Sequence, residues 1–206
     1  MISVDKWSTR KRLSPIIWAM LILLTPCTSW TTEELGYQVV ANINDIEIRA
    51  YKAHQLATVN IESGFTRAGY SAFRYLFDYI SGKNGQGKKI AMTAPVLQSP
   101  TEKGWAVSFV MPESESSKGM PEPSSKQVIG QQVQPALMAA IQYSGSWRKS
   151  RFLNHKQELV NGITKTNYEI CGPITWARYN APFSLPFMRR NEVLAKVCAK
   201  NLNVNI

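Results

Sequence analysis

The side chains that could carry out catalysis or bind a metal are few in this chain. It has two histidines, His54 and His155, and three cysteines, and no C-x-x-C or H-x-x-x-H spacing occurs. A structural zinc site is therefore not expected. No local Ser-His-Asp or Cys-His motif points to a nucleophile. Three glutamates on predicted strands, Glu47, Glu169 and Glu192, could serve as a general base only if they face a common pocket.

The N-terminal segment resembles an export signal. A basic stretch that ends at Arg12 is followed by the apolar run 16–24 and by small and polar residues up to Ser29. The nine apolar residues suit a signal-peptide core and are too few to span a bilayer comfortably. Cleavage after Ser29, lipidation of Cys27 and an uncleaved anchor remain as alternatives. We expect residues 1–29 to be a signal peptide or membrane anchor, and the protein to be exported, either periplasmic or membrane-anchored.

Two cysteines, Cys171 and Cys198, remain if Cys27 is removed or lipidated. An oxidising compartment would permit a disulfide between them. Sequence spacing does not bring two Cα atoms within the range that a disulfide needs. We therefore expect two separate buried thiols.

The chain is basic, with a formal charge of +10. Beyond residue 29, 20 basic and 13 acidic residues leave a formal charge of +7. This charge favours anionic partners such as nucleic acid, acidic lipid or a small molecule with carboxylates. The charges are scattered and no nucleic-acid-binding motif occurs, so we expect no nucleic-acid partner.

Apolar periodicity and turn residues predict alternating strands and helices. A stretch rich in Ser, Pro and Glu, residues 112–125, predicts an exposed mobile loop. The predicted strands cover residues 37–40, 46–51, 54–61, 90–98, 105–111, 136–143, 174–180 and 192–197, and the predicted helices cover 66–80 and 149–160.

Each predicted helix has an apolar face. The sequence Asn161-Gly162 is expected to end the second helix. The predicted core residues are Phe65, Gly69, Ala72, Phe73, Leu76, Phe77 and Ile80 for the first helix, and Phe152, Leu153, Leu159 and Val160 for the second.

The chain repeats one unit. A strand closed by Ser-Gly, a helix, and a strand with Ala-Pro occur twice, with the prolines at Pro95 and Pro182. This predicts two pseudo-symmetric strand–helix–strand–strand repeats, about 37–111 and 131–200. The expected fold is α+β, a distorted antiparallel barrel or sheet with two main helices and a ligand pocket between the halves.

Three segments carry a resemblance to a known family. The segment Ile46-Glu47-Ile48-Arg49-Ala50-Tyr51 resembles the opening signature of the SOUL heme-binding proteins. Residues 89–96 are similar to the central motif of that family, and 179–183 with 189–193 are similar to its C-terminal motif. The resemblance implies that residues 30–206 form a SOUL-type domain related to effector-binding domains of the gyrase-inhibitor type.

The resemblance implies a non-enzymatic function. That function is the binding of heme, a related tetrapyrrole or another anionic planar apolar ligand, for transport, buffering or sensing. A hydrolase that uses pocket carboxylates and a protein-interaction module without heme are the alternatives. We expect a monomer, with any membrane contact made through the N-terminus.

The resemblance also directs attention to particular ligands. Heme-ligating members carry their axial histidine where this chain has Ala50, so the iron ligand would have to come from elsewhere. His54, four residues on, is the first candidate, and His155 is expected to lie on a solvated helix face. Met92, Tyr51 and Tyr179 are further candidate ligands. Arg49, Lys88 and Lys89 could pair with propionates, although a solvated strand edge is the simpler expectation for each.

Overall fold

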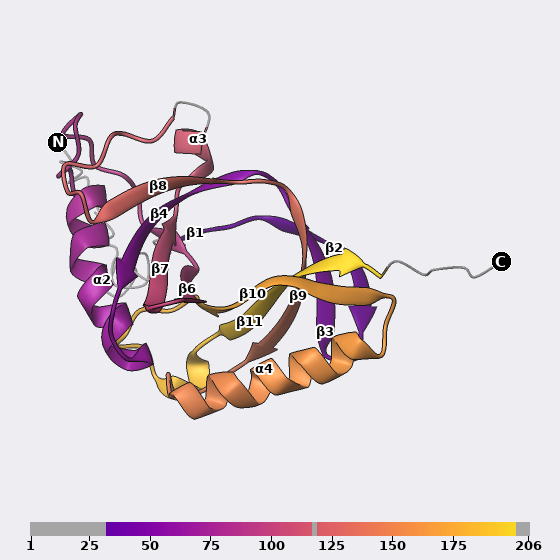
Figure 1. The fold of residues 1–206 in the computed structure, drawn as a ribbon. Coiled ribbons are helices and arrows are strands. Elements are labelled where there is room, and N and C mark those ends of the chain that lie inside the picture. Colours follow the sequence, from indigo (N-terminus) through magenta and orange to yellow (C-terminus); the bar gives the residue numbers. More distant parts are fainter. Residues whose placement is uncertain (1–31, 117–118, 201–206) are drawn as a thin grey trace, which may run out of the picture. The chain divides into compact units, whose positions relative to one another are not determined.

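Two long helices pack on one large antiparallel sheet (Figure 1), and the expected α+β class with two main helices is confirmed. The computed structural model describes residues 32–116 and 119–200. Nine strands pair in the order β2-β3-β9-β11-β10-β6-β7-β4-β8, and β1 and β5 form a separate parallel pair. The elements are β1 (Glu33–Glu34), β2 (Tyr37–Ile43), β3 (Ile46–Tyr51), β4 (His54–Ile61), α2 (Phe65–Ile80), β5 (Thr93–Ala94), β6 (Val96–Thr101), β7 (Gly104–Val110), α3 (Glu113–Ser116), β8 (Val128–Val133), β9 (Ala136–Tyr143), α4 (Lys149–Thr164), β10 (Tyr168–Arg178), the 3-10 helix η2 (Pro186–Met188) and β11 (Asn191–Ala199).

The two halves have the predicted element order, β4-α2-β6-β7 and β9-α4-β10-β11. In the sheet they meet where β6 pairs antiparallel with β10, with Leu97 opposite Ala177 and Val96 opposite Arg178. Since β6 starts just after Pro95 and β10 ends shortly before Pro182, both Ala-Pro segments lie at the same end of this seam. The repeated motif therefore marks the junction of the halves.

The sheet stays open. Its edges are β2 and β8, and no pairing between them closes a barrel within the described residues. The prediction allowed a barrel or a sheet, and the sheet is what forms. Strand β3 pairs with β9, and β8 pairs with β4, so each half is bordered by a strand from the other part of the chain.

Two loop regions differ from the prediction. Residues 112–125, expected to be a loop, contain the short helix α3, and β8 just beyond them was not predicted. The strand expected over 90–98 is broken, because β5 pairs with β1 while β6 joins the main sheet. Both cases depend on partners distant in sequence, which local periodicity does not contain.

The buried face of α2 also differs from the prediction. Phe73 and Phe77, expected in the core, are 37% and 48% exposed. The buried stripe is offset from them and includes Ala68 and Tyr79, because these positions face β4 and β7. The helix therefore presents two phenylalanine rings to solvent, stacked on each other with centroids 5.7 Å apart.

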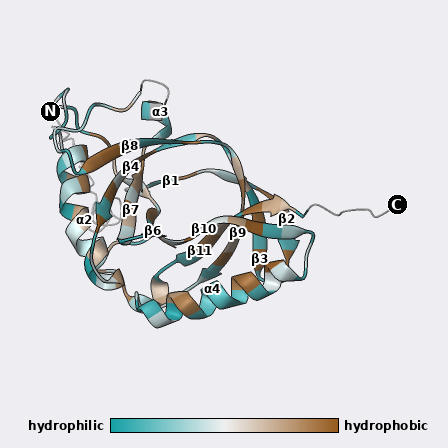
Figure 2. Ribbon diagram, in the orientation of Figure 1, coloured by the Kyte–Doolittle hydropathy of each residue, from teal (hydrophilic) through white to brown (hydrophobic). Residues whose placement is uncertain are grey.

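Helix α4 runs four residues past its predicted end at residue 160. Hydrophobic and hydrophilic residues alternate along it (Figure 2), and Ile163 in its last turn is buried. Gly162 does not end the helix but lets it approach β3, since a Cβ there would lie 2.2 Å from the Ile46 Cδ1 atom. Leu153, predicted to be core, is 44% exposed, and Val160 is only half-buried.

The expectation of two separate thiols is wrong. Cys171 on β10 and Cys198 on β11 form a disulfide, with their Cα atoms 5.9 Å apart. The two strands are neighbours in the sheet, a proximity that sequence spacing does not reveal. The predicted N-terminal signal lies outside the described residues. No helix within the described part of the chain is long and apolar enough to cross a membrane.

Removing this disulfide should destabilise the domain. The bond closes a loop with a sequence separation of 27 residues, and a loop of this size predicts a loss of about 3.5 kcal/mol in unfolding free energy. Urea unfolding of C171S/C198S measures the loss, with C27S as the matched control that should unfold like the parent. An unchanged midpoint in C171S/C198S would show that the bond contributes nothing.

Candidate functional site

A cavity of about 850 Å³ lies where residues 33–38 meet the end of β3 and the start of β4, and we call it the β3–β4 cavity. Its volume is typical of small-molecule sites. Apolar and aromatic side chains line it together with three glutamates, one lysine and one histidine. The lining residues are Glu33, Glu34, Leu35, Gly36, Tyr37, Gln38, Ala50, Tyr51, Lys52, Ala53, His54, Thr93, Val110, Met111, Glu113 and Pro135.

His54 is the side chain in this cavity best suited to bind a metal. It is half-buried, and its Nδ1 lies 2.9 Å from the carbonyl oxygen of Lys52. Because a carbonyl only accepts, Nδ1 donates its proton and the neutral ring keeps its lone pair on Nε2. No hydrogen bond from the described residues occupies Nε2. A backbone carbonyl on the other ring nitrogen is the usual way to orient a metal-ligating histidine.

The position where the resemblance places the family's axial histidine, Ala50, lines the same cavity. Ala50 offers no ligand atom. The cavity nevertheless contains an imidazole, that of His54.

Arg49 is buried and paired, which corrects the expectation of a solvated strand edge. Its side chain is 2% exposed, and its Nη1 and Nη2 atoms donate to the two carboxylate oxygens of Glu192 at 2.7 and 3.2 Å. Its Nε donates to Glu47 at 2.7 Å. A guanidinium engaged in this way is not available to a propionate. Tyr51, two residues along β3 on the same face, lines the cavity.

Glu192 is fully buried at the centre of a polar cluster. Besides Arg49, it accepts hydrogen bonds from Arg190 Nη2 at 2.8 Å and from the Tyr179 hydroxyl at 2.8 Å. Both carboxylate oxygens are therefore engaged. Glu47 is partly exposed, and Glu169 is exposed on β10. The three glutamates do not converge as free carboxylates in the cavity.

Burial and the carboxylate of Glu192 determine which of the neighbouring arginine and tyrosine side chains are charged. Burial alone lowers the pKa of Arg49, but the hydrogen bond and charge of Glu192 outweigh it, so the pKa is raised above its usual range. Burial raises the pKa of Tyr51 to about 12. Burial and the charge of Glu192 also raise the pKa of Tyr179 well above its usual range. At neutral pH the arginines are charged and both phenols are neutral.

Most other predicted ligands lie away from the cavity. Met92 is 41% exposed and Lys89 is exposed, and neither lines the cavity. Lys88 forms an ion pair with a glutamate of α3, and His155 stacks on an aromatic ring with centroids 4.0 Å apart. Tyr179 donates to the buried carboxylate described above. The structure therefore brings together Tyr51 and His54 from the predicted set.

Much of the cavity wall comes from residues that no sequence pattern singles out. Leu35 comes from the segment before β2, Val110 and Met111 from the end of β7, and Pro135 from the turn before β9. No local pattern links these four residues. Only sheet pairing brings them to the same wall.

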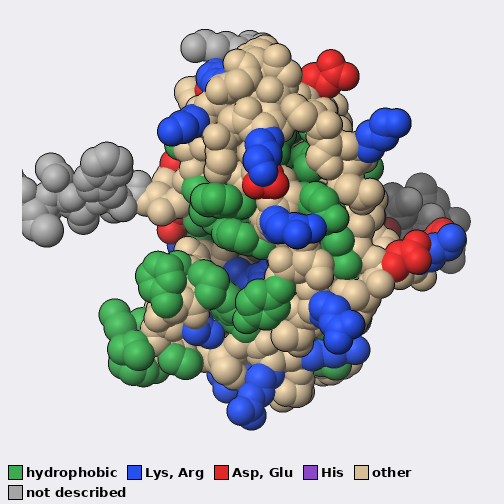
Figure 3. Space-filling view, turned by 90° about the vertical axis from the view of Figure 1, so that its left-hand side faces the viewer, with side chains coloured by type: hydrophobic (Ala, Val, Ile, Leu, Met, Phe, Trp, Pro, Cys, Tyr) green, Lys and Arg blue, Asp and Glu red, His purple; other side chains and the backbone are tan. Residues whose placement is uncertain are grey.

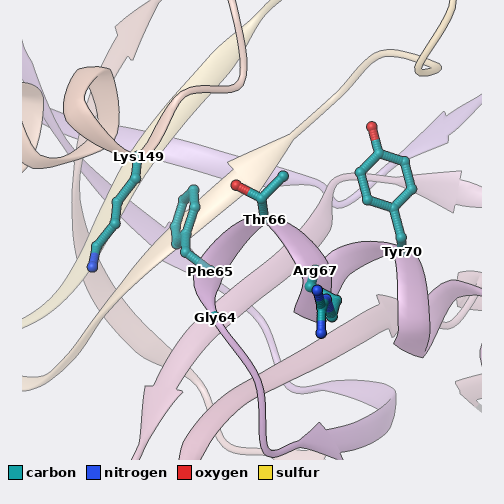
Figure 4. Close-up of a pocket in the computed structure, with 6 residues that line it drawn as sticks. All are labelled: Gly64, Phe65, Thr66, Arg67, Tyr70 and Lys149. Atoms are coloured by element: carbon teal, nitrogen blue, oxygen red, sulfur yellow. The ribbon is translucent and has the colours of Figure 1, made fainter.

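A second, more open pocket of about 660 Å³ lies where the N-terminal ends of α2 and α4 meet. Figure 4 shows Phe65 beside Lys149, with Arg67 and Tyr70 further along α2. Phe65 also stacks on Trp176, with ring centroids 4.9 Å apart. None of the six residues that line this pocket carries an imidazole, a thiol or a carboxylate.

Neutralising Glu192 should destabilise the folded domain. In E192Q, Arg49 and Arg190 keep their charges in a buried site without a carboxylate, which should cost about 3–5 kcal/mol of unfolding free energy. The matched control is E47Q, because Glu47 also binds Arg49 but is 39% exposed, and its loss should stay below about 1 kcal/mol. Urea unfolding or soluble yield measures both. Equal losses would contradict a special role for the buried carboxylate.

Alkaline pH should destabilise the domain through Tyr51. Its folded pKa of about 12 exceeds the ordinary tyrosine value of about 10, so its contribution is complete below about pH 10 and is lost as pH rises towards 12. Across this window the unfolding free energy should fall by roughly 2–3 kcal/mol more in the parent than in Y51F. Urea midpoints of the two proteins from pH 9 to 12 measure the difference. Parallel curves would show that Tyr51 ionises normally.

Comparison with solved structures finds this fold in proteins of low sequence identity. The C-terminal domain of EcmrR is 11% identical, with a TM-score of 0.55 over 79% of this chain and 98% of that chain. EcmrR in a DNA complex is 11% identical, with a TM-score of 0.57 over 90% of this chain and 64% of that chain. A protein from Listeria innocua described as a hydrolase is 10% identical, with a TM-score of 0.50 over 77% of this chain and 94% of that chain. These likenesses concern the fold alone.

Sequence comparison finds no match among curated proteins. The sequence profile described as SOUL heme-binding protein matches residues 32–196. This match runs from β1 into β11, and it includes the residues that line the cavity and the buried carboxylate of Glu192. The chain belongs to the SOUL heme-binding protein family.

Proposed function

We propose that this protein binds heme or a related tetrapyrrole in the β3–β4 cavity, with His54 as the axial ligand of the iron. One observation carries the proposal. His54 lines a cavity of about 850 Å³ and has a free Nε2 lone pair, because its Nδ1 donates to a backbone carbonyl. Membership of the SOUL family supports heme as the ligand.

The residues of the cavity fit the requirements of a porphyrin. Leu35, Val110, Met111 and Pro135 offer apolar contacts for the macrocycle, and Tyr37 and Tyr51 offer aromatic rings. Lys52 would provide a cation for a propionate. The bound iron would supply a site for an axial ligand and for one-electron chemistry.

Two of the three glutamates that line the cavity are already engaged by other groups, which reduces their repulsion of an anionic ligand. Glu33 accepts a hydrogen bond from the Glu113 backbone at 2.8 Å, and Glu34 forms a 2.8 Å ion pair with Arg190. Arg190 thus offsets part of the negative charge at this wall. A ligand bound here would direct its propionates towards Lys52 and solvent.

We favour a binding role over the hydrolase alternative. The best-buried carboxylate, Glu192, accepts hydrogen bonds from two arginines and a tyrosine, so it is not free to accept a substrate proton. Transport, buffering or sensing of the tetrapyrrole is the proposed use. The absence of a nucleic-acid partner stays a prediction.

We also infer that the protein is exported. The disulfide between Cys171 and Cys198 supports an oxidising compartment, where such bonds persist. The basic and apolar N-terminal sequence supports the same inference.

Hemin titration of the full-length chain tests the proposal. The parent should give a saturable Soret shift, and H54G should weaken hemin binding by about tenfold or more and lose the spectrum of imidazole ligation. Added imidazole should restore that spectrum in H54G, because it fills the space of the missing side chain.

The matched control is H155G, because His155 is the only other histidine in the chain. It should bind hemin like the parent. If H54G and the parent have the same spectrum and affinity, His54 is not the ligand. If the parent shows no saturable Soret shift, the heme proposal itself fails.

A further inference from the structure

The loop between β10 and β11 exposes large apolar side chains. We call residues 182–188 the apolar loop. Isolated exposed apolar residues are ordinary, but a contiguous group marks a contact surface. The exposed fractions are 91% for Phe183, 54% for Leu185, 72% for Phe187 and 66% for Met188.

The backbone of the apolar loop is held in place. Arg189 donates from Nε to the Ser184 carbonyl at 2.9 Å and from Nη2 to the Pro182 carbonyl at 2.8 Å. The Gly145 amide donates to the Pro186 carbonyl at 2.9 Å. The loop is therefore anchored to the domain while its apolar side chains face solvent.

Unpaired cations flank the apolar loop. Arg67, Arg148 and Lys149 are exposed, and none has an ion-pair partner among the described residues. Lys149 and Arg67 line one pocket. The Arg189 guanidinium, which follows the apolar loop, lies 4.5 Å from the centre of the Trp147 ring, and Trp147 directly precedes Arg148 in the sequence. Figure 3 shows hydrophobic side chains gathered among Lys and Arg on the face that carries α2.

Two further features make this end of the domain positive. Helices α2 and α4 both begin here, with no acidic residue in the first turn and no side-chain cap, so their free N–H groups add partial positive charge. The Arg178 guanidinium lies 5.2 Å from the centre of the Trp147 ring and 4.8 Å from that of Trp176, and it has no carboxylate partner among the described residues. Burial lowers its pKa to about 10, which leaves it charged at neutral pH.

We propose that the apolar loop and the flanking cations dock on the surface of an anionic lipid bilayer. The loop has only seven residues, whereas a stable protein–protein interface needs about 800 Å² from each partner. A second copy of the chain would bring the same cations face to face, which opposes association. A bilayer provides apolar depth for the loop and anionic headgroups for Arg67, Arg148 and Lys149.

Flotation with lipid vesicles tests this docking. All proteins are full-length and carry I17S/L21S/L24S, so that the apolar run 16–24 does not contribute to binding. This parent should bind vesicles of phosphatidylcholine with phosphatidylglycerol and bind pure phosphatidylcholine much more weakly. F183S/F187S should lose about tenfold or more in partitioning. R67Q/R148Q/K149Q should lose on the order of a hundredfold on the anionic vesicles, since each cation near such a surface contributes about fivefold.

Two matched controls test whether binding depends on the position of these residues or only on the number of exposed apolar and basic side chains. V39S/V40S removes two exposed apolar residues of the β2 edge, and K103Q/K165Q/K196Q removes three exposed cations elsewhere. Both should bind within about twofold of the parent. Hemin titration should be unchanged in every variant, because none alters the β3–β4 cavity.

Three results would overturn the proposal. The parent could fail to bind anionic vesicles, or the controls could lose as much binding as the loop and cation variants. Sedimentation could also reveal a dimer of the parent that F183S/F187S abolishes, which would make the apolar loop a protein interface.

Discussion

A single buried carboxylate holds together the part of the structure that encloses the cavity. Glu192 on β11 has no exposed surface, so it must be neutralised within the protein. Arg49 does this from β3, and Arg190 does it from the position just before β11 while also pairing with Glu34 of β1. The cluster therefore links β3 and β11 of the sheet to the N-terminal segment that forms one cavity wall. Cavity shape and charge balance are coupled through it.

The β3–β4 cavity and the apolar loop differ in shape and in charge, so they suit different partners. The β3–β4 cavity has the volume of a small-molecule site, contains an oriented imidazole and has two of its glutamates engaged by Arg190 or by a backbone amide. The apolar loop exposes four large apolar side chains, and Arg67, Arg148 and Lys149 have no carboxylate partner among the described residues. One surface suits a single bound molecule, and the other suits an extended anionic surface. A heme-binding domain that also rests on a bilayer would meet its ligand where apolar molecules partition.

The sequence predicted the helices and strands of the repeats better than it predicted which strands pair with one another. Both helices, the strand–helix–strand–strand order and the Ala-Pro positions follow from local periodicity and punctuation, and they appear in the structure. Strand β8 and the β1–β5 pair were missed because their stability depends on distant neighbours. The outward position of Phe73 and Phe77 was missed for a related reason. Periodicity places residues on a helix face, but only packing against β4 and β7 decides which part of a wide apolar face is buried.

The same division applies to the site. The sequence alone determined the fold class, the family resemblance and the small set of side chains able to bind iron, because these depend on residue type and local order. The tertiary structure decided which of them meet. It engaged Arg49 with Glu192, left Met92 and Lys89 outside the cavity, and joined Cys171 to Cys198. It also turned Nε2 of His54 away from the backbone carbonyl that binds Nδ1. These outcomes depend on strand pairing between residues far apart in the chain, and on the cost of burying a charge without its partner, which no local pattern encodes.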